Sequence, residues 1–215
     1  LGVRSIIFIT VPAAVGLMSL GVPIVRLLFQ QGKFHSDATL VTASVLFYYA
    51  IGLFAQSAVF VIVRGFYALH DTKTPLKLSL FTIAANYLFS HLFIGFMGAE
   101  GLALAYSLTG FLDMTALLYL LRRKIGQLGI KKMFISFIKV FAAAVVMGAA
   151  AYAMSHYLEI YLPIQKKLFQ AAEIGIVITI AVGIYLAIAK LLKMEEVDTV
   201  LGILMRRFGR RKALA

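Results

Sequence analysis

The chain has 215 residues, of which 62% are hydrophobic and 14% are charged, and its mean hydropathy is +0.95. Soluble domains are roughly 45–50% apolar and about 25% charged. A globule of this length leaves much of its chain at the surface, so water would contact too much apolar area. The composition therefore excludes soluble, disordered and collagen-like proteins, and it predicts an integral membrane protein.

The residues that enzymes use for catalysis or metal binding form no recognisable motif in this chain. There is no cysteine, and the four histidines are scattered without the spacing of a ligand pair. Glycine-rich phosphate-binding loops and nucleophile elbows are absent from the sequence as well. We therefore predict a protein that moves or holds its ligand, that is not an enzyme, and that has no metal or other cofactor.

Six stretches are long and apolar enough to cross a membrane, which takes roughly 20 residues in a helix. They are residues 5–25, 38–68, 75–97, 101–121, 133–157 and 169–192. The first contains Pro12, and the second is long enough to bend near Gly52. Because the loops are short, sequential neighbours are expected to be antiparallel. The predicted fold is an all-α integral membrane protein with about six transmembrane helices.

Polar and helix-breaking residues mark the expected ends of these helices. Thr74 is expected to cap the third helix, with Pro75 at its first position, where a missing N–H has no consequence. Ser36 or Asp37 is expected to cap the second helix. Gly98 separates the third and fourth stretches with almost no loop.

Lysine and arginine are distributed unevenly between the two sides of the predicted membrane protein. Only Arg26, Lys33, Lys166 and Lys167 lie on one side, whereas nearly all the other basic residues lie on the side of the two chain ends. Cytoplasmic loops carry such an excess of positive charge. Both ends of the chain are therefore predicted to be cytoplasmic. The net charge of +12 then reflects topology, and no nucleic-acid partner is expected.

Residues 193–215 are predicted to form a basic cytoplasmic tail. Apolar residues recur at helical spacing from Val197 to Phe208, and arginines follow on or beyond the opposite face. A helix of this kind lies on a membrane surface and binds anionic lipids. The alternative is a frayed extension of the sixth span.

Ionisable and polar residues at membrane depth are the candidate functional residues, because burying them in hydrocarbon is unfavourable. Tyr106, Thr109 and Asp113 have the spacing of one helix face and are predicted to form a polar stripe. The stripe either lines a hydrated cavity or holds a carboxyl group that is hydrogen-bonded between helices. Asn86 and Ser90 also share a helix face, and they favour hydrogen bonds between helices over a substrate or ion site.

Arg4 opens the first span from the predicted cytoplasmic side. It either anchors the helix at the interface or contacts a phosphate group. We therefore include Arg4 with Asn86, Tyr106, Thr109 and Asp113 among the candidate substrate or cavity residues.

Several stretches of this sequence are similar to a known family. They are VRSIIFITVPAAVGLMSLGVPIVRLLF at residues 3–29, QQGKF at 30–34, RGFYALHDTKTPLK at 64–77 and GLALAYSL at 101–108. The most specific pattern consists of Phe66, Tyr67, Ala68, Asp71, Thr72, Thr74 and Pro75. All resemble the carboxy-terminal half of the MurJ/MviN family, bacterial lipid II flippases of the MOP exporter superfamily. The resemblance covers most of the chain and weakens after about residue 125.

The resemblance implies a fold and assigns different roles to different parts of the chain. The six spans would correspond to the last six of fourteen helices in a bacterial inner-membrane protein, with amino-terminal helices of the same protein as partners. Residues 1–125 would belong to the carboxy-terminal transport lobe, and residues 126–192 would form an extra helix pair with a groove for a lipid tail. The implied activity is movement of lipid II, an undecaprenyl-pyrophosphate-linked peptidoglycan precursor, by alternating access.

The resemblance also implies a cation site in some members, at the positions of Asn86, Ser90, Leu102 and Tyr106. Ser90 and Tyr106 stand where an aspartate and a threonine are expected, so the site is predicted to be degraded. Coupling to sodium and coupling to protons both stay open.

Two other functions are compatible with the same features. One is a related MOP exporter of a polyprenyl-linked oligosaccharide or a drug. The other is a membrane enzyme of lipid-linked sugar metabolism, which should carry acidic or histidine clusters in its cytoplasmic loops. The loops here contain only Asp71, Glu195, Glu196 and Asp198 as acidic residues, and this argues against the enzyme.

Cysteines introduced into this cysteine-free chain test the predicted topology. Cysteines that replace Lys33 and Lys166 should react with a membrane-impermeant thiol reagent added from outside the cell. Cysteines at Lys73, Gly126 and Arg207 should react only after the membrane is permeabilised. The reverse labelling pattern would overturn the predicted orientation.

Overall fold

The computed structural model describes residues 2–30, 35–126, 130–161, 167–194 and 196–197. These residues form seven helices: α1 (Gly2–Ser19), α2 (Gly21–Phe29), α3 (Ser36–Ala68), α4 (Lys73–Met97), α5 (Ala99–Ile125), α6 (Ile130–Tyr161) and α7 (Lys167–Leu191). Six of them, all but α2, are long and apolar enough to cross a membrane. The predicted all-α fold with six spans is therefore confirmed. The predicted tail lies outside the described residues from position 198 onward.

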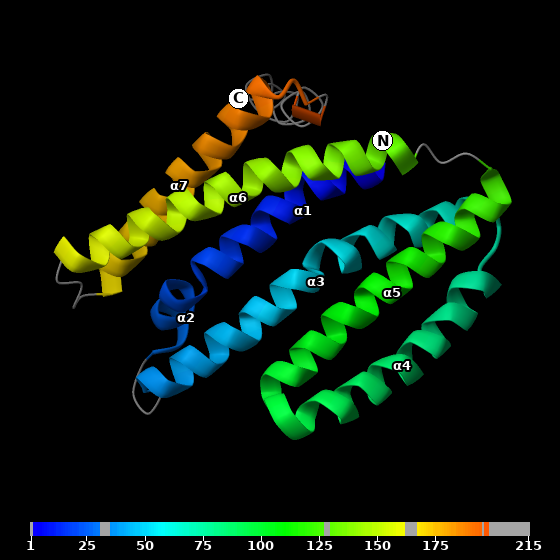
Figure 1. Cartoon of the computed structure of the whole chain (residues 1–215), viewed down its shortest axis with the longest axis horizontal. Coiled ribbons are helices and arrows are strands. Elements are labelled where there is room, and N and C mark those ends of the chain that lie inside the picture. Colours follow the sequence, from blue (N-terminus) through cyan, green and yellow to red (C-terminus); the bar gives the residue numbers. More distant parts are fainter. Residues whose placement is uncertain (1, 31–34, 127–129, 162–166, 195, 198–215) are drawn as a thin grey trace, which may run out of the picture.

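The helices form two packed groups, which meet where α1 contacts α3 (Figure 1). In one group α5 packs between α3 and α4, around a core of Ala58, Ile62, Phe66, Leu117 and Leu121. In the other group α6 packs against α1 and α7, and α1 also contacts α3. The sixth helix therefore uses α1 and α7 as its main neighbours rather than the sequentially preceding α5.

The lysine- and arginine-rich ends of the helices lie together in space. The start of α1, the turn between α3 and α4, the end of α5, the start of α6 and the end of α7 all gather on one side (Figure 1). We call this side the basic end. The α2 helix, the α4–α5 turn and the start of α7 lie on the other side (Figure 1).

The first predicted span is not one continuous helix, and this part of the prediction is wrong. Its helix ends at Ser19 and a separate helix begins at Gly21, with Leu20 between them at φ −107° and ψ 12°. The cause is Pro23, which has no N–H to donate to the Ser19 carbonyl four residues earlier and whose ring crowds that carbonyl. The Ser19 hydroxyl, at the end of α1, donates to the carbonyls of Val15 and Gly16 at 3.0 and 3.2 Å.

Helix capping also differs from the prediction. The residue before α3 is His35, and neither Ser36 nor Asp37 caps that helix, because both already lie inside it. The α4 helix begins two residues before Pro75, and its first turn is capped by Asp71, whose Oδ1 accepts the Thr74 N–H at 3.0 Å. The turn at Gly98 is as short as expected, since this glycine, at φ +61°, ends α4 and precedes α5.

The contact between α3 and α5 is closest at Gly52. The Gly52 N–H donates to the Ser107 hydroxyl at 3.1 Å, and that hydroxyl donates to the Tyr48 carbonyl at 2.5 Å. Ser107 thus bridges the two backbone groups that an undisturbed helix would join directly, which is a recognised cause of helix bending. A Cβ atom at Gly52 would lie 2.6 Å from the Ser107 Cα, so only glycine permits this approach.

Replacement of Gly52 tests this close contact. Gly52→Ala should lower the free energy of unfolding by about 1–3 kcal/mol, because the added methyl group overpacks the interface. Gly183→Ala is the matched control, since a Cβ at Gly183 meets nothing within 4 Å. It should leave stability unchanged or raise it slightly. Equilibrium unfolding in mixed micelles measures both, and equal stability of the two variants would contradict the packing described here.

Candidate functional site

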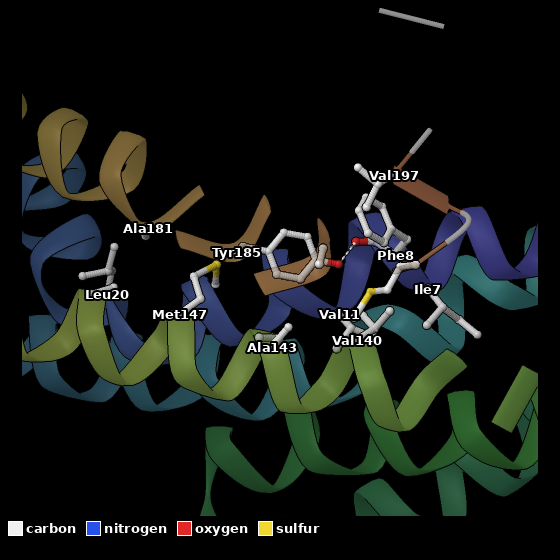
Figure 2. Packing of buried hydrophobic residues seen from close by; sticks show 14 of the residues in the cluster. Ile7, Phe8, Val11, Leu20, Val140, Ala143, Met147, Ala181, Tyr185 and Val197 are labelled. Carbon is white, nitrogen blue, oxygen red and sulfur yellow. Dashed lines mark hydrogen bonds between the residues drawn. The ribbon is translucent and has the colours of Figure 1, made fainter. Parts of the chain in front are cut away.

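An apolar groove of about 560 Å³ lies between α1, α6 and α7, where it also reaches α2. Its lining includes Phe8, Pro12, Leu17, Met147, Val182 and Leu186. Part of this lining belongs to the main hydrophobic core, in which α1, α6 and α7 meet (Figure 2). A groove with so few polar atoms suits a hydrocarbon chain rather than a charged group.

The wall of the groove depends on a proline inside α1. Pro12 has no N–H, so the carbonyl of Phe8 lacks its usual partner within the helix. The Tyr185 hydroxyl of α7 donates to this carbonyl at 2.8 Å (Figure 2). The rings of Phe8 and Tyr185 also contact each other, with their centroids 5.2 Å apart. A single tyrosine thus satisfies the carbonyl that has no partner within α1, and it joins α7 to α1 across the groove.

A layer of polar side chains lies between α4 and α5. The Asn86 amide donates to the Thr109 hydroxyl at 3.3 Å. The Thr82 hydroxyl lies 3.4 Å from the Asp113 carboxylate and shares its proton between this oxygen and the Leu78 carbonyl, which is 2.8 Å away. Thr109 donates in turn to the Ala105 carbonyl of its own helix at 2.6 Å. Three of the candidate residues, Asn86, Thr109 and Asp113, therefore lie along one helix interface.

Tyr106 lies against a different helix from the rest of the predicted polar stripe. Its ring meets Tyr49 of α3 edge-on, with 5.3 Å between centroids, and its carbonyl accepts from the Gln56 amide at 3.5 Å. Thr109 and Asp113 face α4 instead. The helix face that carries the stripe is thus divided between the two neighbours of α5.

The four positions of the implied cation site come from the same two helices. Asn86 and Ser90 belong to α4, and Leu102 and Tyr106 belong to α5, with both α5 side chains exposed. The side-chain amide of Asn86 donates its hydrogen bond to Thr109. Over the described ranges, no group of three or more His, Asp or Glu side chains is arranged to hold a metal ion.

Arg4 lies in a separate cluster at the basic end. Its Nε donates to Glu196 at 2.7 Å, and the Ser136 hydroxyl of α6 donates to the same carboxylate oxygen at 2.7 Å. Only 6% of the Glu196 side chain is exposed. Burial by itself would raise the pKa of Glu196. The hydrogen bonds from Ser136, from a backbone N–H and from Arg4, together with the charge of Arg4, outweigh burial and hold this pKa below its ordinary value.

The residues of the family motif build the α3–α4 turn at the basic end. Phe66 is fully buried, and its carbonyl accepts the N–H of Asp71 at 3.0 Å. The Asp71 carboxylate caps α4 and forms an ion pair with Lys124 at the end of α5. The ammonium of Lys124 and the N–H and hydroxyl of Thr74 hold the pKa of Asp71 well below its usual range. The motif thus ties three helix ends together.

Two of these interactions were not predicted from the sequence. The bond from Tyr185 to Phe8 had a signal in the sequence, because a proline within a span always frees a carbonyl that needs a donor. The pairing of Arg4 with Glu196 had none, since the two residues are separated by 192 positions and nothing in their local sequence relates them.

Replacement of Tyr185 tests the groove wall. Tyr185→Phe keeps the ring but removes the donor, leaving the Phe8 carbonyl unsatisfied in an apolar setting. The free energy of unfolding should fall by about 1–3 kcal/mol. Tyr152→Phe on α6, where the side chain is 62% exposed, should change it little. If unfolding in mixed micelles shows the same small effect for both, the bond contributes nothing to the groove.

Comparison with known proteins places these features in a family. A family model described as lipid II flippase MurJ matches residues 1–171. A probable lipid II flippase MurJ from Rhizobium tropici is 28% identical over 211 residues, which cover 98% of this chain and 39% of that protein. One from Vibrio cholerae is 36% identical over 118 residues, covering 55% of this chain and 22% of that protein.

A solved structure agrees with the sequence matches. A lipid II flippase MurJ in an inward closed conformation superimposes with a TM-score of 0.71 at 26% identity, covering 88% of this chain and 37% of that one. The chain thus spans well under half of the length of these relatives.

Proposed function

The chain belongs to the MurJ family of lipid II flippases, and its described residues include six membrane-length helices, so it is a multi-pass inner-membrane protein. We propose that it works as the carboxy-terminal part of such a flippase. Its activity is movement of the undecaprenyl-pyrophosphate-linked peptidoglycan precursor across the bacterial inner membrane by alternating access. It transports this lipid and does not transform it. The apolar groove between α1, α6 and α7 is the observation that carries the proposal.

The groove accommodates the polyprenyl tail of the substrate. Residues 126–192 supply α6 and α7 as the extra helix pair, and α1 of the transport lobe supplies the third wall. An isoprenoid chain needs apolar area and no charge, which matches the lining. At Phe8 the groove borders the transport lobe, and the hydrogen bond from Tyr185 connects α7 of the extra helix pair to α1 of the lobe. A tail in the groove therefore lies directly against the lobe.

The substrate headgroup needs a different environment. A pyrophosphate requires several cationic groups in a protected cavity, because charge at membrane depth is unfavourable. Most of the described basic residues lie at the basic end, whereas Arg26 of α2 and Lys167 of α7 lie at the opposite end. The layer between α4 and α5 offers polar groups but no cation. We therefore assign the pyrophosphate contacts to helices that the longer relatives have in addition, which act as partners of this segment.

The basic end is cytoplasmic in this proposal. Positive charge is retained on the cytoplasmic side of inner-membrane proteins, and both described ends of the chain lie at the basic end. We assign the coupling of transport to a proton or sodium ion to the polar layer that contains Asp113. We prefer this layer to the implied cation site at Asn86, Ser90, Leu102 and Tyr106.

A chimera tests the proposed function directly. The part of the Rhizobium tropici relative that precedes the matched region should be joined to residues 1–215 and expressed in cells depleted of their own flippase. The chimera should restore growth, whereas residues 1–215 alone should insert into the membrane without restoring it. An inserted but inactive chimera would contradict the proposal for this segment, and rescue by residues 1–215 alone would contradict the assignment of the headgroup contacts to other helices.

Asp113 is tested in the same chimera. Asp113→Asn keeps an oxygen that accepts from Thr82 but removes the ionisable group, so transport should fall at least several-fold while expression is maintained. Thr82→Val is the matched control, because it removes the hydrogen bond and leaves the carboxyl group, and it should transport well. Lipid II movement in inverted vesicles measures both. Normal transport by Asp113→Asn would reduce the carboxyl group to a packing role.

A further inference from the structure

A second cavity, of about 270 Å³, lies at the basic end and is separate from the apolar groove. Three elements form it: the start of α1, the first third of α6 and the turn that follows α7. Its polar lining consists of Arg4, Ser136, Lys139, Lys193 and Glu196. Three of these side chains are cationic and one is anionic, so the described lining carries two net positive charges.

The carboxylate in this lining is already satisfied by the protein. Glu196 accepts from Arg4 and from Ser136, both at 2.7 Å, and it is almost completely buried. An entering cation would have to displace these donors. The positive charge that stays available therefore belongs to the two lysines.

Helix α6 and the turn after α7 position the two lysines, Lys139 and Lys193, at the cavity. Lys139 comes from α6, and its ammonium donates to the Leu192 carbonyl beyond the end of α7 at 3.3 Å. An ammonium has three donors, so this bond leaves others for a ligand. Lys193 lies in the turn at φ +48°, and its N–H bonds back to the Lys190 carbonyl at 3.0 Å, which fixes the turn beside the cavity.

The surroundings of the cavity are those of a lipid headgroup site. It lies where α1 begins and α7 ends, and the ends of membrane-length helices are expected near the membrane surface. Ile135 and Met194 form apolar parts of its wall. Close in sequence to the lining residues, Phe134 and Ile138 of α6 and Leu191 of α7 are exposed by 61%, 51% and 80%, and they offer apolar surface for acyl chains.

We propose that this cavity binds the phosphate of an anionic glycerophospholipid, with the ammonium groups of Lys139 and Lys193 as its ligands. Ammonium groups suit phosphate oxygens as point charges, and the exposed apolar side chains around them favour a lipid over a free phosphate ion. The bound lipid would join α6 to the turn after α7. Because α1 also lines the cavity, the lipid would stabilise the packing of the extra helix pair against α1. That this lipid comes from the cytoplasmic leaflet rests on the orientation proposed above.

Binding is tested with purified full-length protein in detergent by native mass spectrometry. The probes are dioctanoyl phosphatidylglycerol, its zwitterionic phosphatidylcholine counterpart and inorganic phosphate. Phosphatidylglycerol should bind in preference to phosphatidylcholine, and K139Q/K193Q should weaken it on the order of 30-fold, since each lysine near a lipid headgroup contributes a factor of about five. K139R/K193R should retain the preference.

The matched control is K73Q/K77Q, which removes two exposed lysines from the start of α4 at the same end of the molecule. It should bind phosphatidylglycerol as the unmodified protein does. Equal binding of both lipids, an unchanged preference in K139Q/K193Q, or full competition by inorganic phosphate would each overturn the proposal. The measurement uses neither transport nor a membrane, so its failure is distinct from a failure of the flippase proposal or of the orientation.

Discussion

The fold depends on one constraint of the bilayer: a backbone polar group at membrane depth has no water and must find its partner within the protein. Regular helices meet this constraint by themselves, but α1 and α3 do not. Pro12 frees the Phe8 carbonyl, and the Tyr185 hydroxyl of α7 satisfies it. In α3 the Ser107 hydroxyl of α5 bridges the Gly52 N–H and the Tyr48 carbonyl. At both places an irregularity in one helix determines which other helix packs against it.

These two bonds fix the arrangement of the functional regions. The bond from Tyr185 joins α7 to α1 and so closes one side of the apolar groove, while α6 supplies its floor. The bond through Ser107 holds α5 against α3, which leaves the opposite side of α5 to meet α4 with Thr109 and Asp113. Charged groups do not line the groove, and at the basic end they form the pairs of Arg4 with Glu196 and of Lys124 with Asp71. Hydrocarbon, polar and ionic contacts are therefore segregated by position.

Much of this fold could be predicted from the sequence, because span length and hydropathy report directly on the membrane. The family motif was likewise recognisable, although its role in tying α3, α4 and α5 together was not. The break at Leu20 was missed because Pro23 falls within an uninterrupted apolar run, whose hydropathy does not register a lost N–H donor. The division of the polar stripe was missed for another reason. Spacing places Tyr106, Thr109 and Asp113 on one face of α5, but only the rotation of α5 between two neighbours decides that Tyr106 meets Tyr49 and Asp113 meets Thr82.

The central claim is that the groove between α1, α6 and α7 holds the polyprenyl tail of the substrate. The most direct measurement places the photoreactive residue p-benzoylphenylalanine in the full-length protein at Val182, which lines the groove, or at Ile176 on the same helix, which is 56% exposed and does not line it. After illumination in membranes that contain radiolabelled undecaprenyl-linked precursor, we expect strong capture of the labelled lipid at Val182 and weak capture at Ile176. Equal capture at the two positions, or capture at Ile176 alone, would contradict it.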